Sequence, residues 1–148
     1  MIDFVTAEPF HLDMIDPLEV FNDDASLIAR QKAAILSPDS MCWTMFSGDE
    51  AIAVVGITVF WNGVAEIWSV ISKGMYRSKI SFAKSLKRFL YAAIDGFSLS
   101  RCQVTVRAGS LVAERWVKFL GFKRESTMKM FGPSGNDYHL YVRLQNGR

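Results

Sequence analysis

The chain has 148 residues, half of them hydrophobic, and a formal net charge of +2. This length is enough for one domain with a substantial core and too short for a second, so we expect a single domain over residues 1–148. The small net charge argues against a general nucleic-acid binder. Cys42 and Cys102 each lie in an apolar segment, which predicts buried free thiols and neither a disulfide nor a metal site.

The longest apolar stretch predicts no membrane span. It runs from Ala51 to Trp61, is interrupted by Gly56 and Thr58, and is too short to cross a bilayer. The first residues, Met1 to Asp3, do not open a signal peptide. We therefore expect a cytosolic protein that does not associate with membranes.

The N-terminal region predicts a short extended segment followed by helix. The extended start lies around Phe4 and Val5, and helical patterning runs from His11 to Leu36. Pro17 and Pro38 interrupt or end this pattern because proline lacks the backbone N–H. Either Asn22 or Asp24 would cap the helix.

The middle of the chain predicts three strands and a long amphipathic helix. The strands are Met41 to Phe46, Ala51 to Phe60 and Val64 to Ile71, and the helix is Ser78 to Phe97. Turn residues between the strands, Ser47 to Glu50 and Asn62-Gly63, indicate two hairpins.

The C-terminal third predicts a strand, a helix and a closing hairpin. The strand is Ser100 to Arg107, the helix is Leu111 to Leu120, and the hairpin strands are Ser126 to Phe131 and Tyr138 to Leu144. Val112, Trp116, Phe119 and Leu120 form the apolar face of the helix, and Gly121 ends it. A strand-helix-strand crossover makes its strands parallel, whereas hairpins are antiparallel. We therefore expect an α/β fold with a mixed sheet flanked by helices.

The strand from Arg101 to Val106, the helix after it and the Leu120-Gly121-Phe122 stop resemble the last conserved segment of the GCN5-related N-acetyltransferases (GNAT). The element order of nearly the whole chain is similar to that family too. The resemblance implies the acyl-CoA N-acyltransferase fold, acetyl-CoA as co-substrate, and an amine of a small molecule or protein as acceptor. It favours an enzyme.

The resemblance also implies where acetyl-CoA would bind. Backbone at Val70, Ile71 and Ser72 would lie beside the acyl group, and the following loop would hold the pyrophosphate. Ser78 and Ile80 stand where the family has glycines, so positive charge would replace close backbone approach. The implied binding residues are Val70, Ile71, Ser72, Lys73, Arg77, Ser78, Lys79 and Ser110, the last at a frequent asparagine position. For Lys84, Lys87 and Arg88, a solvated helix face is favoured over phosphate binding.

Glu66 is the best candidate for a catalytic base. It is the one charge in an otherwise apolar strand, and burial beside Trp68 would raise its pKa toward a useful range. The alternative is a cavity-lining glutamate without a chemical role. Backbone N–H groups near Val70 to Ser72 would polarise the thioester. The usual acid position of the family holds Val117, which cannot donate a proton.

A second resemblance concerns Glu66-Ile67-Trp68, Arg101-Cys102-Gln103 and Arg115-Trp116, which look like the acetyltransferase-like proteins of tailed bacteriophages, including the internal virion protein A group. It implies an alternative function as a catalytically inactive phage protein with a role in the virion or in host interaction. Its partners would be phage or host proteins, and its location the host cytoplasm or the virion. A homodimer is compatible with the sequence.

Overall fold

The computed structural model describes residues 1–18 and 25–145. The N-terminal elements are β1 (Ile2–Thr6), η1 (Pro9–Met14), α1 (Ala25–Leu36), β2 (Ser40–Ser47), β3 (Glu50–Trp61) and β4 (Val64–Ile71). They are followed by η3 (Lys73–Ser78), α2 (Lys79–Gly96), β5 (Arg101–Arg107), α3 (Leu111–Phe119), β6 (Lys123–Met128) and β7 (Tyr138–Leu144).

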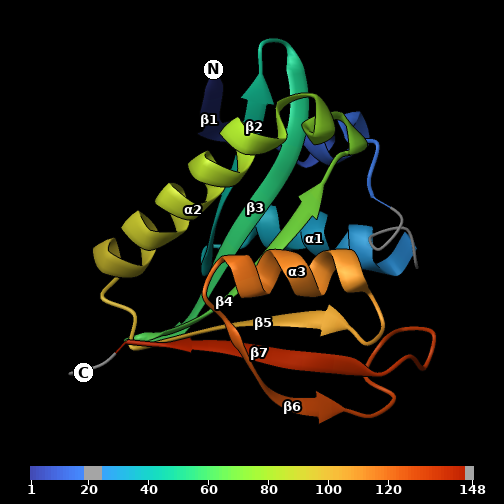
Figure 1. Cartoon of the computed structure of the whole chain (residues 1–148), viewed down its shortest axis with the longest axis vertical. Helices are drawn as coiled ribbons and strands as arrows, with labels where there is room; N and C mark the ends of the chain where they lie inside the picture. The colour runs from blue at the N-terminus through green and yellow to red at the C-terminus, as the bar shows by residue number, and fades with distance from the viewer. Residues whose placement is uncertain (19–24, 146–148) are drawn as a thin grey trace.

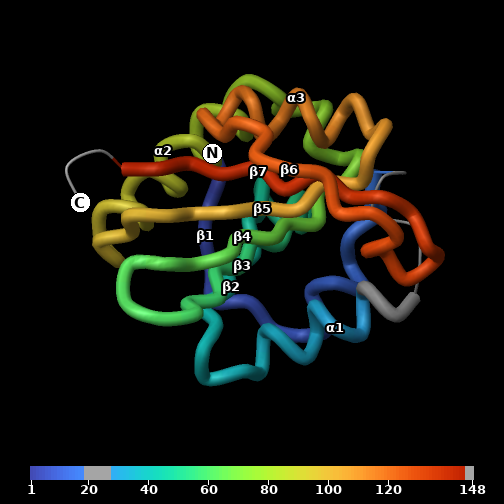
Figure 2. Tube along the Cα trace, turned by 90° about the horizontal axis from the view of Figure 1, so that it is seen from below, coloured from blue at the N-terminus to red at the C-terminus, as the bar shows by residue number. Residues whose placement is uncertain are grey.

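The strands form one mixed sheet in the order β1-β2-β3-β4-β5-β7-β6. Among the strands of the described residues, only β4 and β5 pair in parallel, and α2 makes the crossover between them (Figure 1). Helices α2 and α3 lie on one face of the sheet and α1 on the other (Figure 2). The predicted α/β fold with a mixed sheet is therefore confirmed. In the part of the chain that the structure describes, no helix is long and apolar enough to cross a membrane.

The sheet is buried on both faces. On one face α2 contributes four buried side chains, Phe82, Leu86, Leu90 and Ile94. On the other face, buried residues of the N-terminal segment, such as Leu12 and Ile15, pack with Val54 and Val70. This double burial explains why β3 reads as an almost continuous apolar run.

The predicted helix from His11 to Leu36 is wrong in its first half. His11 lies in η1, a short 3₁₀ helix with proline in its first turn, and the segment that follows forms an isolated antiparallel bridge between Pro17 and Ser72, the residue after β4. Without a backbone N–H, Pro17 cannot continue a helix, and strand-like pairing takes its place. Within the described residues, helix α1 begins at Ala25. The proposed caps, Asn22 and Asp24, lie outside the described residues.

Two C-terminal predictions also need correction. Phe119 is 42% exposed and Val112 37%, whereas Glu114 and Val117 are the buried residues of α3. Strand β6 begins at Lys123 and ends at Met128, so Phe131 belongs to the following turn. Because β6 is an edge strand with mostly exposed side chains, apolar alternation does not mark it.

Glu114 is buried because two partners meet its carboxylate. The hydroxyl of Tyr141, which is fully buried on β7, donates a hydrogen bond to Glu114 Oε1 at 2.6 Å. The Arg124 guanidinium on β6 donates to the same oxygen at 3.0 Å. The hydrogen bond from Tyr141 is the main cause that holds the pKa of Glu114 below its ordinary value, and Arg124 lowers that pKa further. This network ties α3 to the outer two strands.

We predict that Glu114→Gln lowers the free energy of unfolding at pH 7 by about 1–3 kcal/mol, because the two hydrogen bonds to Oε1 lose the charge of their acceptor. A carboxyl whose folded pKa is depressed stabilises above its unfolded pKa, near 4.5, and loses that contribution as the pH falls through the folded value. The difference between parent and variant should therefore shrink below pH 4.5. Urea unfolding at pH 7 and at pH 3.5 measures it, with the exposed Asp95→Asn as control. A constant difference at both pH values would contradict the assignment.

Candidate active site between two parting strands

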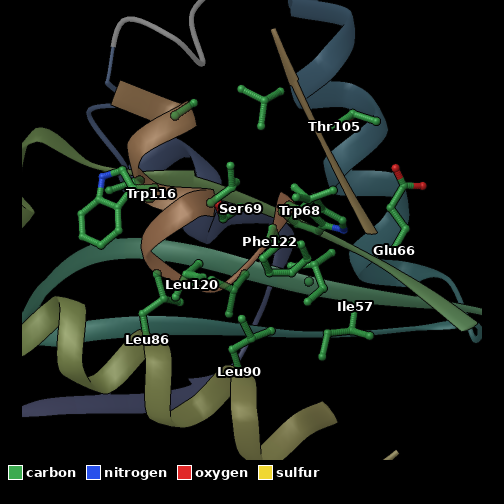
Figure 3. Close-up of a pocket in the computed structure, with 18 of the residues that line it drawn as sticks. Ile57, Glu66, Trp68, Ser69, Leu86, Leu90, Thr105, Trp116, Leu120 and Phe122 are labelled. Carbon is green, nitrogen blue, oxygen red and sulfur yellow. The ribbon is translucent and has the colours of Figure 1, made fainter. Parts of the chain in front are cut away.

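Strands β4 and β5 pair over only three positions, with Val64 opposite Arg101 and Glu66 opposite Gln103 at the two ends of the run. Both strands continue beyond this point, to Ile71 and to Arg107, without pairing with each other. The parting leaves a cavity of about 200 Å³ bordered by both strands. Its lining residues come from both faces of the sheet (Figure 3). A ligand can therefore contact the sheet edge and both helical layers at once.

One side of the cavity is apolar. It is formed by Leu86 and Leu90 of α2, by Trp116 and Val117 of α3, and by Leu120, which follows α3 (Figure 3). Trp116 is held by edge contacts with Phe82 and Phe119, with ring centroids 5.4 and 6.0 Å apart. Such a surface suits an aliphatic chain better than a charged group.

The other side of the cavity carries its polar groups. Glu66 and Trp68 lie on the same face of β4, Thr105 and Arg107 on one face of β5, and Gln31 comes from α1. In Figure 3 Glu66 and Thr105 lie at the end of the cavity away from Trp116. Of these residues only Glu66 was a candidate from the sequence. Gln31, Thr105 and Arg107 are distant in sequence, and no local pattern marks them.

Glu66 is half-buried at the last pair before the strands separate. Burial raises its pKa above the ordinary value of 4.5, and the charge of Arg30 on α1 opposes that rise. The expected direction of the shift is therefore confirmed. Within the described residues, Glu66 is the one acid that lines the cavity.

The Trp68 indole lies directly over Gly56, its register partner on β3. A Cβ added at Gly56 would stand closer than van der Waals contact to three atoms of the ring, including Nε1. Nε1 of Trp68 and Oε1 of Gln31 are both buried and have no hydrogen-bond partner in the described part of the chain. Two side chains that line the cavity with Glu66 thus each carry a buried polar atom without a hydrogen-bond partner.

The backbone near Val70 differs from the expectation that Val70 to Ser72 all present N–H groups to a ligand. The Ser72 N–H donates to the Ile52 carbonyl of β3 at 2.9 Å. Because N–H groups alternate in direction along a strand, those of Ser69 and Ile71 point to the side where β5 has separated. Val70 and Ile71 are buried, and only Ile71 of the two lines the cavity.

The first backbone N–H groups of the loop after β4 already donate hydrogen bonds within the protein. Lys73 N–H donates to the Asp16 carbonyl at 2.8 Å, Gly74 N–H to the Ser72 hydroxyl at 3.2 Å, and Met75 N–H to the Ser72 carbonyl at 3.1 Å. These bonds make η3 a closed 3₁₀ turn over the buried Met75. The first half of the loop therefore offers no amide cradle for a phosphate.

Residues 16–18 lie at one end of the cavity. Leu18 N–H donates to the Ile71 carbonyl at 2.9 Å, and the buried Leu18 side chain lines the cavity. This pairing extends the sheet on the side where β5 has left β4. Residues 16–18 thus close the far end of the open strand edge.

The predicted phosphate-binding side chains lie outside the cavity. Lys73, Arg77 and Lys79 are exposed around the start of α2, and Arg77 forms an ion pair with Glu50. The Ser78 side chain makes no capping hydrogen bond, and the first turn of α2 contains no acid. Ser110, at the start of α3, is buried and makes no side-chain cap either. None of these residues therefore lines the cavity that contains Glu66.

The side chains that could protonate the leaving group differ in where they lie and in whether another group already occupies them. Val117 lines the cavity and is buried, Tyr141 is engaged with Glu114, and His139 lies within 2.9 Å of Thr127 Oγ1. Tyr138 is the tyrosine that borders the cavity. In residues 1–18 and 25–145 no three histidine, cysteine or acidic side chains gather as a metal site.

Comparison with solved structures identifies the fold. The chain resembles a putative acetyltransferase at 17% identity, with a TM-score of 0.75 over 97% of this chain and 85% of that one. A GNAT-family acetyltransferase from Streptococcus pneumoniae matches at 16% identity and 0.68, over 97% and 99% of the two chains. An IAA acetyltransferase from Bacillus cereus matches at 12% and 0.74, over 98% and 100%. The chain thus has the GNAT fold.

In sequence, no family model and no curated protein matches the chain significantly. The likeness therefore rests on three-dimensional structure, and at these identities it establishes the fold.

We predict that Gly56→Ala destabilises the protein by about 1–3 kcal/mol, because the new methyl group must displace the Trp68 ring. In a Trp68→Phe background the penalty should be smaller, since the ring atoms nearest Gly56 are gone. Chemical unfolding of the four proteins measures this coupling. Gly96→Ala is the control, because a Cβ there meets nothing within 4 Å. Equal penalties in both backgrounds would show that the ring does not occupy this position.

Proposed function

We propose that the protein is an N-acetyltransferase of the GNAT type that transfers the acetyl group of acetyl-CoA to an amine. The observation that carries the proposal is a carboxyl with a raised pKa, Glu66, at a cavity opened by two parting parallel strands. The GNAT fold supports it. Acetyl-CoA, when bound, supplies the thioester that the amine attacks.

The residues of the cavity fit the acyl end of such a co-substrate. The apolar wall of Leu86, Trp116 and Leu120 suits an aliphatic arm, and the outward N–H groups of Ser69 and Ile71 can donate to a carbonyl oxygen. Glu66 accepts the proton that the amine loses. Val117 cannot protonate the departing thiolate, so water or the Tyr138 hydroxyl supplies that proton.

The phosphate end would be held by charge rather than by a glycine loop. Amides 73–75 are occupied, which leaves the uncapped first turn of α2 together with Lys73, Arg77 and Lys79. The positive end of a helix and three cations favour a phosphate at this position. Of the backbone from Val70 to Ser72, the Ile71 N–H faces the open side, since the Ser72 N–H is bonded to the Ile52 carbonyl. With the Ser110 hydroxyl it completes the proposed cofactor-binding set.

The first test is binding and turnover. We expect acetyl-CoA to bind in calorimetry and thiol to be released from it with amine acceptors. Glu66→Gln should lower the rate by the ~10²–10⁴-fold typical of a lost general base. The parent rate should fall as the pH drops through the Glu66 pKa, which lies above 4.5, and the variant should lack this step. Asp95→Asn is the control. Unchanged rates in Glu66→Gln would remove Glu66 from the mechanism.

A second test concerns the phosphates. Arg77→Glu should weaken acetyl-CoA binding by about 1 kcal/mol, roughly fivefold, because the side chain is largely exposed and its charge is screened. Arg88→Glu, an equal charge reversal on the exposed face of α2, should leave the affinity unchanged. Calorimetric titration of both variants measures the difference, and equal affinities would refute the phosphate role.

The alternative from the sequence is an inactive protein of the same fold with a phage or host partner. Absence of acetyl-CoA binding at millimolar concentration would favour it. The resemblance to phage proteins gains no support from the structures above and stays a prediction, as do a homodimer and a place in the host cytoplasm or the virion.

A further inference from the structure

The cavity contains two polar atoms that the proposed acetyl transfer does not use. Trp68 Nε1 and Gln31 Oε1 belong to side chains that line the same cavity, and both atoms are buried without a hydrogen-bond partner in the described part of the chain. Buried polar atoms are hydrogen-bonded in almost all cases, because an unmet one costs free energy. Two such atoms from different elements, β4 and α1, indicate that a ligand supplies the missing partners.

The chemistry of these atoms limits the ligand. An indole N–H can only donate, so the ligand must present an acceptor atom to Trp68. The Gln31 carboxamide offers its oxygen, and with it a place for an N–H of the ligand. Glu66 lies two residues before Trp68 on the same strand face, and Figure 3 shows the nitrogen-bearing edge of the indole turned toward it. The acceptor atom and the reacting nitrogen are therefore close neighbours in the ligand.

We propose that the amine acceptor is an α-amino carbonyl compound, such as the free N-terminus of a peptide or an amino-acid amide, whose carbonyl oxygen accepts a hydrogen bond from Trp68 Nε1. This assignment rests on the proposed acetyl transfer. The α-nitrogen lies beside Glu66, and an N–H of the same unit faces Gln31. Trp68 is then a specificity-determining residue.

Other amines satisfy the cavity less well. A polyamine carries further positive charges, whereas Glu66 is the one acid among the described lining residues. A simple alkylamine leaves Trp68 Nε1 without a partner. An α-amino group also has an ordinary pKa near 8, against about 10.4 for lysine, so more of it is neutral near pH 7.

The transfer balances with the groups named. The neutral α-nitrogen attacks the thioester carbonyl carbon, an N–C bond forms and the C–S bond breaks. Glu66 takes the proton that the nitrogen loses, and the thiolate takes a proton from water or from Tyr138. Trp68 contacts the acceptor and takes no part in the proton transfers.

Two matched amines test the proposal. Glycinamide contains the α-amino carbonyl unit, and isobutylamine has the same number of heavy atoms without the carbonyl. Compared at equal concentrations of the neutral amine, glycinamide should give a kcat/KM about 10- to 100-fold higher, the range of one buried hydrogen bond. Trp68→Phe should abolish that preference by lowering the glycinamide rate alone, mainly through KM. Trp61→Phe, at a residue 67% exposed, is the matched control.

A binding measurement separates this proposal from acetyl transfer itself. Without acetyl-CoA, glycinamide should move the indole ¹H–¹⁵N resonance of Trp68 downfield, and isobutylamine should not. The resonance is assigned by its loss in Trp68→Phe, and if that variant fails to fold, by its proximity to Gly56.

Each outcome decides one or both proposals. A shift with glycinamide but no turnover with either amine would refute acetyl transfer and support the carbonyl subsite. Equal use of both amines, or an equal loss for both in Trp68→Phe, would overturn the subsite and assign Trp68 to the shared acetyl group. Neither shift nor turnover would overturn both, with water satisfying the two buried atoms.

Discussion

The parting of β4 from β5 after three paired positions is the constraint on which the rest of the site depends. Pairing further along the strands would bury the N–H groups of Ser69 and Ile71 in a ladder and close the cavity. The parting is held by side chains such as Leu86 and Trp116 and by the pairing of Leu18 N–H with the Ile71 carbonyl, and the Leu18 side chain packs in the same cluster as Leu86. Glu66 stands at the last pair, where a carboxylate is desolvated yet still reaches a ligand.

The sequence predicted most of the fold because the strongest periodic segments are also the central ones. Strand β4 and helix α2 lie within one residue of their expected bounds. The errors arise where tertiary pairing outweighs local pattern. The N-terminal helix was interrupted by strand-like pairing at Pro17, and the buried acid on α3 was hidden because its partner Tyr141 lies 27 residues away.

The site was predictable only in part. Glu66 stood out as the single charge in an apolar strand, and burial does raise its pKa. The poverty of glycine in the loop was visible as well, but the bond from Lys73 N–H to the Asp16 carbonyl was not, since it joins segments 57 residues apart in sequence (73 minus 16). Gln31 was missed for the same reason, because its helix reaches the cavity only in the folded chain.

Gly56 and Trp68 face each other across β3 and β4, and the smallest residue makes room for the largest. The two side chains therefore occupy one common space, and a bulkier residue at one position requires a smaller residue at the other. Among homologues of this chain the two positions should covary, with larger residues at 56 accompanied by smaller rings or aliphatic groups at 68. The part of the cavity that is proposed to bind the amine would then change shape through paired substitutions at positions 56 and 68. A substitution at one of the two positions alone would be selected against.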